Sequence, residues 1–459
     1  MLLDPADQRP VHFVGVAGAG MSALAELFTR RGVRVTGCDA SVEGIADLKR
    51  RGIHVEHGHD PAHVAGARAL VVTSAMPKDH PELARARAQG LPVVRRAEAL
   101  GEATSGAGRL LVAVAGTHGK STTTAMAAEA LAAAGRDPTA LVGARVPRWS
   151  GNLRAGADQL YVAEADEYDR SFLALNPTIA VVTNVEADHL DVYRDLDDIR
   201  RAFEQFIAKA RGVVLCADDP GAAALRTPPS GEVIRYGIRS GDARLVAKDA
   251  QPASGGSSFA VEFDGERLGR VTLNVAGAHN VLNALAALGS GLALGAPFHA
   301  LSRGLAAFVG TERRFERLGE ARGITIIDDY AHHPTEIVAT LDAARASFPG
   351  RRLVVAFQPH LFSRTRDFAP EFARALSGGD VVFLTDIYAA REQPIAGVSS
   401  DLIATAFSDR GKLAWRGDRN GLAASLASSV RSGDVVITMG AGDITKTGRE
   451  LLHRLERAA

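Results

Sequence analysis

The sequence predicts an α/β protein of three domains built on largely parallel sheets. Apolar runs of strand length alternate with helix-length stretches through almost the whole chain, which is the pattern of strands covered by helices. The 459 residues exceed what one core usually organises, because domains run to ~100–200 residues. A hydrophobic content of 46% and a charged content of 23% are typical of soluble globular proteins and exclude wholesale disorder.

The first predicted domain covers residues 1–107. Its elements in order are a strand at 11–14, a Gly-rich loop GVAGAG at 15–20, a helix at 21–31 and strands at 33–36 and 69–73. The loop has the spacing G-x-x-G-x-G, whereas the dinucleotide fingerprint would need Gly at Ala17. Asp39 is placed to meet a ribose hydroxyl, so we predict a diphosphate-containing ligand, with a bare packing turn as the alternative. Residues 101–108 are expected to be a linker because small residues gather there.

The second predicted domain covers residues 108–311. Its elements are a strand at 110–115, a loop at 116–121, a helix at 122–134, strands that end at 164 and near 184, and a helix that begins near 280. Residues 212–275 are rich in Pro, Gly and Ser between short strands, and we expect antiparallel additions to the sheet. A tight turn is predicted at Asp264-Gly265.

The strongest local motif is GTHGKST at 116–122. Glycines let backbone N–H groups approach phosphate oxygens, and the helix N-terminus adds positive potential. Lys120 can reach β- and γ-phosphates, and the Ser121 hydroxyl can bind Mg²⁺. The standard P-loop has Gly five residues before Gly119, where this chain has Val114, so the match is to a shortened loop. An ordinary Gly-rich turn is the alternative, which a Lys followed by hydroxyl residues disfavours.

Two acidic segments follow strands of the same domain. EADEYD at 164–169 places Glu164 where ligands bind in such sheets, and carboxylates are ligands for Mg²⁺. TNVEADHLDVY at 183–193 places His189 after the next strand. The alternatives are a solvated acidic loop and a structural histidine, since His is a less usual magnesium ligand.

The third predicted domain covers residues 312–459. Its predicted strands are at 324–327, 353–357, 381–384 and 435–439. DDYAHHPTE at 328–336 and FQPHLFSRTRD at 357–367 both follow strands and form a polar, cationic rim. Arg side chains there suit carboxylates and phosphates through paired N–H donors.

Zinc is not expected at either group of histidines. The pair His332 and His360 lacks a third soft ligand at a known spacing. The second group is read as a solvated strand and turn and consists of His54, His57, His59 and His63. The two cysteines, Cys38 and Cys216, are too few for a disulfide framework or a Cys-rich metal site.

Composition also limits the partners. Lys+Arg and Asp+Glu both number 53, so a strongly basic nucleic-acid binder is not expected. The N-terminus lacks the pattern of a secretory signal. Residues 271–302 contain no Asp, Glu, Lys or Arg, but their His, Asn, Gly and Pro indicate a buried helix rather than a membrane span. We expect a cytoplasmic enzyme that binds neither nucleic acid nor membrane.

The motifs occur together in the order found in Mur ligases, and the chain resembles that family from Gly15 to Asp443. The segments that carry the resemblance are GVAGAGMSALA, AGTHGKSTTTAM, EADEYDRSFL, TNVEADHLD, GAHNVLNALAA, RRFE, DDYAHHPTEI, FQPHLFSRTRD, DIYAAREQPI and GAGD. The resemblance implies Rossmann-like N- and C-terminal domains around a central P-loop ATPase-like domain. The first domain is expected to bind a UDP-linked substrate, the second ATP and Mg²⁺, and the third to close over ATP and the amino acid.

The implied reaction joins L-alanine to UDP-N-acetylmuramate with ATP, in a monomer or weak homodimer. The alternative is a recycling ligase that adds a murein tripeptide to the same nucleotide sugar, because Tyr168 in EADEYD is also seen there. TNVEADHLD favours the alanine reaction. Residues 200–205 contain no Lys for the carbamylation that other Mur ligases use, which also favours it. Different classes also considered are a nicotinamide-dependent oxidoreductase and a non-catalytic nucleotide-binding protein.

The resemblance also assigns site residues. Those implied to bind ATP are Gly116, Thr117, His118, Gly119, Lys120, Ser121, Thr122, His279, Asn280, Asn283, Arg314 and Asp329. Those implied to bind magnesium are Ser121, Glu164 and His189. Those implied to bind the nucleotide sugar or the amino acid are Gly18, Ala19, Gly20, Met21, Ser22, Asp39, Ser74, Asn152, Tyr330, His332, His360 and Arg364. The implied catalytic residues are Lys120, His189, Arg314 and His332. Ser121 replaces the more usual Thr, and Leu361 stands where relatives often carry Arg.

Overall fold

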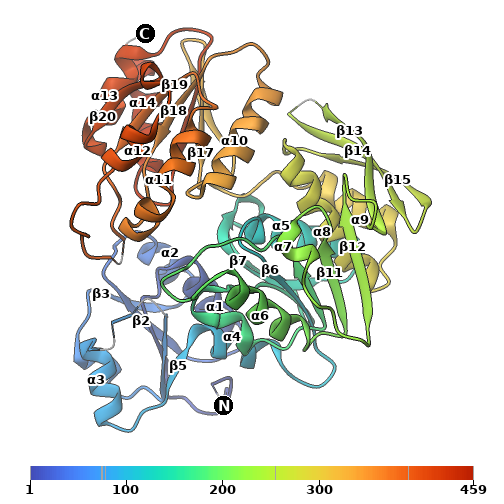
Figure 1. The fold of residues 1–459 in the computed structure, drawn as a ribbon. Coiled ribbons are helices and arrows are strands. Elements are labelled where there is room, and N and C mark those ends of the chain that lie inside the picture. Colours follow the sequence, from blue (N-terminus) through green and yellow to red (C-terminus); the bar gives the residue numbers. More distant parts are fainter. Residues whose placement is uncertain (1, 74–75, 78, 254, 391, 458–459) are drawn as a thin grey trace. The chain divides into compact units, whose positions relative to one another are not determined.

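The computed structural model describes residues 2–73, 76–77, 79–253, 255–390 and 392–457. They form three β-sheets with helices packed against them (Figure 1). The three-sheet α/β architecture confirms the predicted fold class. The chain divides into two compact units. The first unit comprises Met1–Asp249, Phe259–Thr272 and Leu282–Phe308, and the second comprises Ala250–Ser258, Leu273–Val281 and Val309–Ala459.

The N-terminal sheet is parallel, with strand order β3-β2-β1-β4-β5. Its strands are β1 (Val11–Val14), β2 (Val35–Asp39), β3 (His54–His57), β4 (Ala69–Val72) and β5 (Val93–Arg95). Its helices are α1 (Ala19–Arg30), α2 (Ile45–Arg50), η1 (Pro61–Val64), α3 (Pro81–Ala88) and α4 (Arg96–Thr104). The central strands β1 and β4 are buried along their whole length, as parallel strands covered on both faces are.

The predicted linker at 101–108 is wrong in its first half, because α4 continues to Thr104. Leu100 and Ala103 are buried in the core, which keeps the chain helical there. Gly101 allows this helix to approach the central domain closely. A Cβ at Gly101 would lie 2.6 Å from the carbonyl oxygen of Ala174, so the small residue serves packing rather than flexibility.

The central sheet has ten strands in the order β15-β14-β13-β12-β11-β10-β6-β9-β7-β8. The strands are β6 (Leu110–Ala115), β7 (Pro138–Val146), β8 (Gly151–Arg154), β9 (Ala157–Glu164), β10 (Ile179–Val182), β11 (Gly212–Cys216), β12 (Glu232–Gly237), β13 (Leu245–Ala253), β14 (Gly256–Phe263) and β15 (Glu266–Leu273). The helical elements are α5 (Lys120–Ala133), η2 (Pro147–Trp149), η3 (Tyr168–Ala174), α6 (Leu196–Ile207), α7 (Pro220–Ala223), α8 (Ala278–Ala293) and α9 (Phe298–Ala306). Helix α1 of the N-terminal domain packs against β7 and β8, within the same unit.

The expectation of antiparallel additions throughout 212–275 is wrong for the first strands. β11 pairs in parallel with β10, β12 with β11, and β13 with β12. β11 is buried at every position, as a central parallel strand is. The predicted turn at Asp264-Gly265 is confirmed between β14 and β15. Both residues have positive φ, as a two-residue hairpin turn requires.

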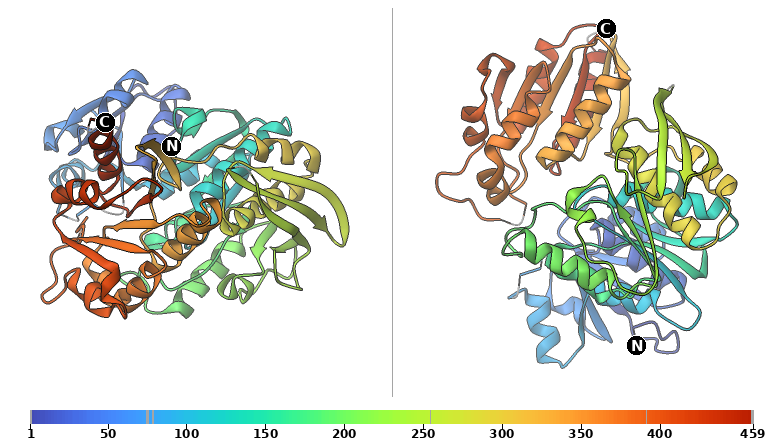
Figure 2. Two further views of the ribbon diagram at one scale, coloured as in Figure 1. Left: turned by 90° about the horizontal axis from the view of Figure 1, so that it is seen from above. Right: turned by 45° about the vertical axis from the view of Figure 1, so that its right-hand side comes forward.

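The C-terminal sheet has six strands in the order β16-β17-β21-β18-β19-β20, and only β16 of the described pairs runs antiparallel. The strands are β16 (Glu316–Ala321), β17 (Ile324–Asp329), β18 (Leu353–Phe357), β19 (Val381–Thr385), β20 (Leu413–Gly417) and β21 (Val435–Met439). The helical elements are α10 (Pro334–Ser347), α11 (Phe362–Leu376), α12 (Asp401–Ala406), η4 (Arg410–Lys412), α13 (Arg419–Ser429) and α14 (Thr445–Arg457). Helices α10 and α11 contribute to the core on one face and α13 and α14 to that on the other (Figure 2, right).

The uncharged stretch at 271–302 forms helix α8 and part of α9, and residues 284–288 are fully buried, as predicted. In the described part of the chain, no helix combines the length and the apolar character that crossing a membrane requires.

Candidate active site

The loop between β6 and α5 is held against the end of β10. The Thr117 N–H donates to the Asn184 carbonyl at 3.1 Å, and the His118 N–H donates to Asn184 Oδ1 at 2.7 Å. The hydroxyl of Thr183 donates to the His118 carbonyl at 2.6 Å. Gly116 makes this close approach possible, because a Cβ there would lie 2.0 Å from Thr183 Oγ1. These contacts fasten the loop to the segment that follows β10.

Helix α5 begins at Lys120, whose ammonium group is tied to this loop and to one carboxylate. Nζ donates to the Gly116 carbonyl at 2.6 Å and to the two carboxylate oxygens of Glu167 at 2.9 and 2.7 Å. Burial lowers the pKa of Lys120, but the carboxylates of Glu167, Asp166 and Glu164 together outweigh it and the net shift is upward. For Glu167 burial raises the pKa, and Lys120 and His189 together make the net shift downward. The pair is thus an ammonium and a carboxylate at neutral pH.

Two of the three expected magnesium ligands touch each other. Glu164, at the end of β9, accepts a hydrogen bond from the Ser121 hydroxyl and one of 2.6 Å from the Gly143 N–H. Burial raises the pKa of Glu164, and these hydrogen bonds oppose the rise. The third expected ligand, His189, has a positive φ of 54°, and its Nε2 lies 3.6 Å from Glu167 Oε1. Buried carboxylate and hydroxyl oxygens are a donor set that suits a hard divalent cation.

A cavity of about 260 Å³ joins the N-terminal Gly-rich loop to this carboxylate cluster within the first unit. Its lining from the N-terminal domain consists of Gly18, Ala19, Gly20, Met21, Leu24, Thr73, Arg96 and Leu100. Its lining from the central domain consists of Leu141, Val142, Gly143, Glu164 and Asp166. Four of the residues expected to bind the nucleotide sugar thus share a cavity with an expected magnesium ligand.

Other residues expected to bind the substrate are engaged inside the protein. The Asp39 carboxylate accepts the N–H groups of Ala17 and Ser41, both at 2.8 Å, so it supports the Gly-rich loop. The hydroxyl of Ser22 donates to the Ala19 carbonyl at 2.9 Å. The buried Asn152 donates to the Val142 carbonyl at 3.3 Å, next to the cavity lining. Ser74 lies outside the described residues.

The segment expected to hold the adenine and ribose begins helix α8. Asn283 packs on the loop between β6 and α5, because its Oδ1 accepts the Thr123 hydroxyl at 3.1 Å and would lie 2.6 Å from a Cβ at Gly119. Asn280 donates to the Ala276 carbonyl at 2.7 Å. In the second unit, burial and then the nearby Arg314 lower the pKa of His279 to about 4, so its imidazole is neutral at physiological pH.

The second unit gathers its expected residues around Glu336 in helix α10. Arg314 Nη1 lies 3.5 Å from Glu336 Oε1, and the Arg314 guanidinium lies over the Tyr330 ring at 5.0 Å. The His332 N–H donates to Glu336 Oε2 at 2.9 Å, and the imidazole Nδ1 lies 3.0 Å from the same oxygen. Asp329 accepts the N–H groups of Phe315 and Ala331, both at 2.7 Å.

The end of β18 supplies the remaining side chains of this group. The rings of His332 and His360 lie 5.8 Å apart, and His360 stacks on Tyr388 at 5.9 Å. Arg364 Nη1 lies 3.5 Å from His360 Nδ1. Leu361, where relatives often carry Arg, is buried at 4% exposure, so it contributes packing in place of a charge.

Three residues of these clusters carry no role in the sequence-based assignment. Glu167 belongs to the EADEYD motif, but only the fold brings it to Lys120. Arg96 begins helix α4, lies 3.3 Å from Asp166 and lines the cavity. Glu336 is the last residue of the DDYAHHPTE motif. It lies four residues after His332 at the start of a helix, a spacing from which their contact could have been predicted.

Family models cover most of the chain. The Mur ligase family catalytic domain matches residues 10–107, the Mur ligase middle domain matches 114–291, and the Mur ligase glutamate ligase domain matches 313–442. The chain belongs to the Mur ligase family.

Relatives within the Mur ligase family are similar over nearly full length. The UDP-N-acetylmuramate–L-alanine ligase of Acidothermus cellulolyticus is 48% identical over 440 residues, covering 94% of this chain and 91% of its own. The crystal structure of UDP-N-acetylmuramate-alanine ligase from Thermotoga maritima has a TM-score of 0.83 at 30% identity, covering 98% of this chain and all of that one. A murein peptide ligase from Psychrobacter arcticus has a TM-score of 0.74 at 25% identity, covering 97% and 98%. The sequence identities and the TM-score are higher for the two alanine ligases than for the murein peptide ligase.

Proposed function

We propose that this Mur ligase joins L-alanine to UDP-N-acetylmuramate at the expense of ATP, in the cytoplasm, as part of peptidoglycan precursor synthesis. The cavity in the first unit carries the proposal. It is lined by Gly18 to Met21 of the N-terminal loop and by Glu164 of the central site, so a nucleotide sugar bound to the loop has its reacting end near phosphate-transfer machinery. The similarity to alanine ligases over nearly the whole chain supports the choice of substrates.

The chemistry requires activation of a carboxylate. Amide formation from a free carboxylate would need oxide as leaving group, whereas an acyl phosphate releases phosphate. Transfer of the γ-phosphoryl group depends on alignment and charge neutralisation more than on covalent help from the protein. Lys120, at the start of helix α5, bonds to the loop that we expect to hold phosphates, and it supplies one positive charge. Arg314 is the candidate for a second positive charge.

A magnesium ion suits the donor set of Ser121, Glu164 and His189, and when bound it neutralises phosphate charge during transfer. The protein's own residues prepare this site. The Gly143 N–H orients one Glu164 oxygen at 2.6 Å, and Ser121 bonds to the same carboxylate. The ring of Tyr168 packs edge-on against His189 at 5.1 Å and holds its imidazole.

The amino-acid step needs a neutral amine and a stabilised oxyanion. The amine of L-alanine attacks the acyl phosphate, the tetrahedral oxyanion is stabilised by nearby cations, and phosphate leaves. In the second unit, His332 and Arg364 are candidates to receive the amino acid. His332 is oriented by Glu336, as an imidazole that accepts or passes a proton should be.

The test is phosphate release from ATP and Mg²⁺ with UDP-N-acetylmuramate, screened against single amino acids and the murein tripeptide. Release with L-alanine, matched by mass spectrometry to a product extended by one alanine, is expected. Release only with the tripeptide would transfer the assignment to the recycling reaction and leave the phosphate chemistry in place. ATP binding without release for any acceptor would contradict the proposed activity.

A further inference from the structure

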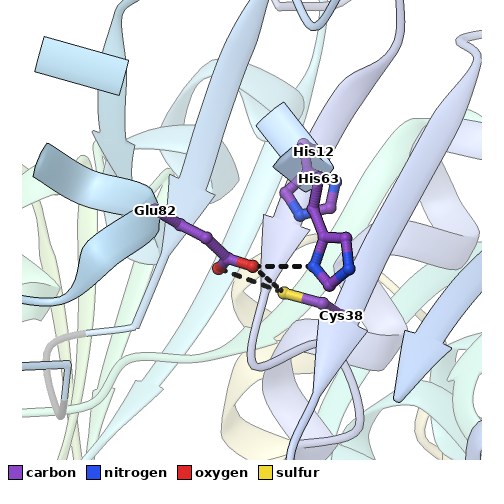
Figure 3. A group of neighbouring side chains, drawn as sticks. All are labelled: His12, Cys38, His63 and Glu82. Carbon is purple, nitrogen blue, oxygen red and sulfur yellow. Dashed lines mark hydrogen bonds and ion pairs between the residues drawn. The ribbon is translucent and has the colours of Figure 1, made fainter. Parts of the chain in front are cut away.

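A second cluster of reactive side chains surrounds Glu82 in the N-terminal domain, and none of its members lines the cavity. Glu82, at the start of α3, is fully buried. Its ion-pair partners among the described residues are all histidines, and no Lys or Arg is among them. Figure 3 shows Glu82 facing Cys38 of β2, with His12 of β1 and His63 of η1 beside it. Since no Lys or Arg of the described residues pairs with this buried carboxylate, a metal cation from solution is one way to offset its charge.

The four side chains are close enough to share one ion. The Cys38 thiol donates to Glu82, with Sγ 3.1 and 3.2 Å from the two oxygens, and His63 Nδ1 lies 2.9 Å from Oε1. One ligand atom from each of the four residues lies within 4.8 Å of every other. Ligands of a tetrahedral zinc ion with bonds of ~2.1 Å lie roughly 3.4 Å apart, so the widest of these separations has to shorten by at most about 1.4 Å to reach that geometry.

His12 supplies the observation that hydrogen bonding does not explain. Its Nδ1 lies 2.9 Å from the Thr36 hydroxyl, while Nε2 is buried with no hydrogen-bond partner among the described residues. If Nδ1 donates its proton to Thr36, the lone pair of Nε2 is left toward the cluster, which is how metal-binding histidines are usually fixed. Burial lowers the pKa of His12 to about 4, so the ring is neutral, as a metal ligand must be.

We propose that His12, Cys38, His63 and Glu82 form a binding site for a zinc ion. Binding breaks the Sγ–H bond of Cys38, releases that proton to solvent and forms a Zn–S bond. The dication, the thiolate and the carboxylate then sum to zero charge, which removes the cost of burying Glu82 alone. Four protein ligands leave no open position, so the site is structural and ties β1, β2, η1 and α3 together.

The outer histidines give the ion a route to this site. His59 Nδ1 lies 3.3 Å from Cys38 Sγ and 3.5 Å from a Glu82 oxygen, and its side chain is 26% exposed. His80 packs edge-on against His59 at 4.6 Å, and its Nδ1 lies 3.8 Å from Glu82. The reading of a solvated strand and turn is wrong for His63, which is half-buried against Glu82, but it agrees with the exposed position of His59. His54 and His57 are exposed on β3, as that reading expects.

The ligand set separates this site from the magnesium site. Sulfur and imidazole ligands select zinc and similar transition metals, whereas Mg²⁺ prefers oxygen. The site also adjoins the Gly-rich loop, because the carbonyl of Cys38 accepts the N–H groups of Gly15 and Val16 at 2.9 and 3.1 Å. The inference does not depend on the proposed ligase activity, since it concerns binding alone.

Cobalt substitution tests the site directly. The full-length protein is stripped of metal with a chelator and titrated with Co²⁺ in excess Mg²⁺. One equivalent is expected to give a thiolate-to-cobalt charge-transfer band that Zn²⁺ then abolishes. Cys38→Ser should lose the band, while Cys216→Ser, at the other buried cysteine, should keep it. His63→Asn removes a direct ligand and should weaken Zn²⁺ binding by at least ~10–100-fold, which is the loss caused by removing an outer-shell partner.

Two results would overturn the proposal. One is a natively folded wild-type protein that shows no charge-transfer band. The other is a band of equal strength in wild type and Cys38→Ser. If Cys38→Ser fails to fold, judged by circular dichroism, the affinity of His63→Asn decides the question alone, because His63 is partly exposed and lies on a short 3₁₀ turn. Unchanged zinc affinity in that variant would contradict the assignment.

Discussion

Glu167 and Glu82 are both buried carboxylates on segments that connect strands of a sheet, and their charges are stabilised in different ways. Glu167 bonds twice to the ammonium group of Lys120, at 2.9 and 2.7 Å. Glu82 bonds to a thiol, an imidazole and the Asp60 N–H. Burial raises the pKa of Glu82, but these hydrogen bonds make the net shift downward, so it also remains ionised.

The difference indicates what each site accepts. A carboxylate paired with a lysine holds that lysine in place at the start of helix α5, where we propose that it meets phosphates. A carboxylate surrounded by neutral donors that can lose protons, such as a thiol, is suited to a metal ion. The following changes test this comparison in order of expected effect.

Lys120→Ala removes the fixed cation and should have the largest effect. We expect kcat to fall by ~10²–10³-fold, because one group that stabilises the transferring phosphoryl is lost. The free energy of unfolding should fall by about 3–5 kcal/mol, since Glu167 is left buried without its partner. Adding Glu167→Gln to this variant should restore stability but not activity. Near-normal turnover in Lys120→Ala, measured by phosphate release, would contradict the phosphate role.

Asp329 is a third buried carboxylate, whose hydrogen bonds come from backbone N–H groups. Burial raises its pKa to about 6 from 3.8, while Arg314 opposes the rise. The folded state therefore holds this proton more tightly, so the stability it gives is present near pH 4 and lost as pH rises to about 6. Relative to Asp329→Asn, the wild type should lose ~3 kcal/mol of unfolding free energy over that window.

Denaturant unfolding at several pH values measures this change, with the exposed Asp342→Asn as control. A constant difference in unfolding free energy between wild type and Asp329→Asn across the window would show that Asp329 is ionised throughout.

His189→Ala tests whether the Glu167 site also serves a metal. We expect the Mg²⁺ concentration for half-maximal activity to rise by ~10-fold or more, because a ligand or its support is lost. The exposed His299→Ala in helix α9 is the matched control. A Mg²⁺ dependence equal to that of the wild type would remove His189 from the ligand set.

Gly20→Ala should have the smallest effect and concerns a cation that faces the cavity. A Cβ at Gly20 would lie 2.9 Å from Arg96 Nη1, and this flexible guanidinium can move aside. We expect KM for the nucleotide sugar to rise by roughly 3–10-fold with kcat little changed, since binding alone is affected. Gly241→Ala, where a Cβ meets nothing within 4 Å, is the control. Identical KM values would show that the displacement of Arg96 by a Cβ at position 20 does not affect substrate binding.

The strands of the fold could be predicted from the sequence because buried parallel strands are continuous apolar runs. The strands at 11–14, 110–115, 353–357 and 435–439 agree with the structure at both ends. The orientation of β11 and β12 was not readable, because turn-rich connections suggested hairpins. The site motifs lie on loops that directly follow strands. Their positions could therefore be predicted from the strand positions alone.

Contacts between residues that are far apart in the chain could not be predicted from the sequence. Lys120 and Glu167 are 47 residues apart, and Cys38 and Glu82 are 44 apart. No periodicity links such positions, because sheet order and not chain order brings them together. The sequence places the histidines at 54–63 in one group, whereas the structure separates exposed His54 from His63, which bonds to Glu82.

The contact between Gly116 and Thr183 also limits which amino-acid substitutions can accumulate at these two positions during evolution. Every other amino acid carries a Cβ, and at Gly116 that atom would lie 2.0 Å from Thr183 Oγ1, in a backbone conformation with φ of 137°. A substitution at either position changes what the other can tolerate. Across diverging descendants of this gene, the loop glycine can therefore be replaced only after the strand end opposite it has already been rebuilt.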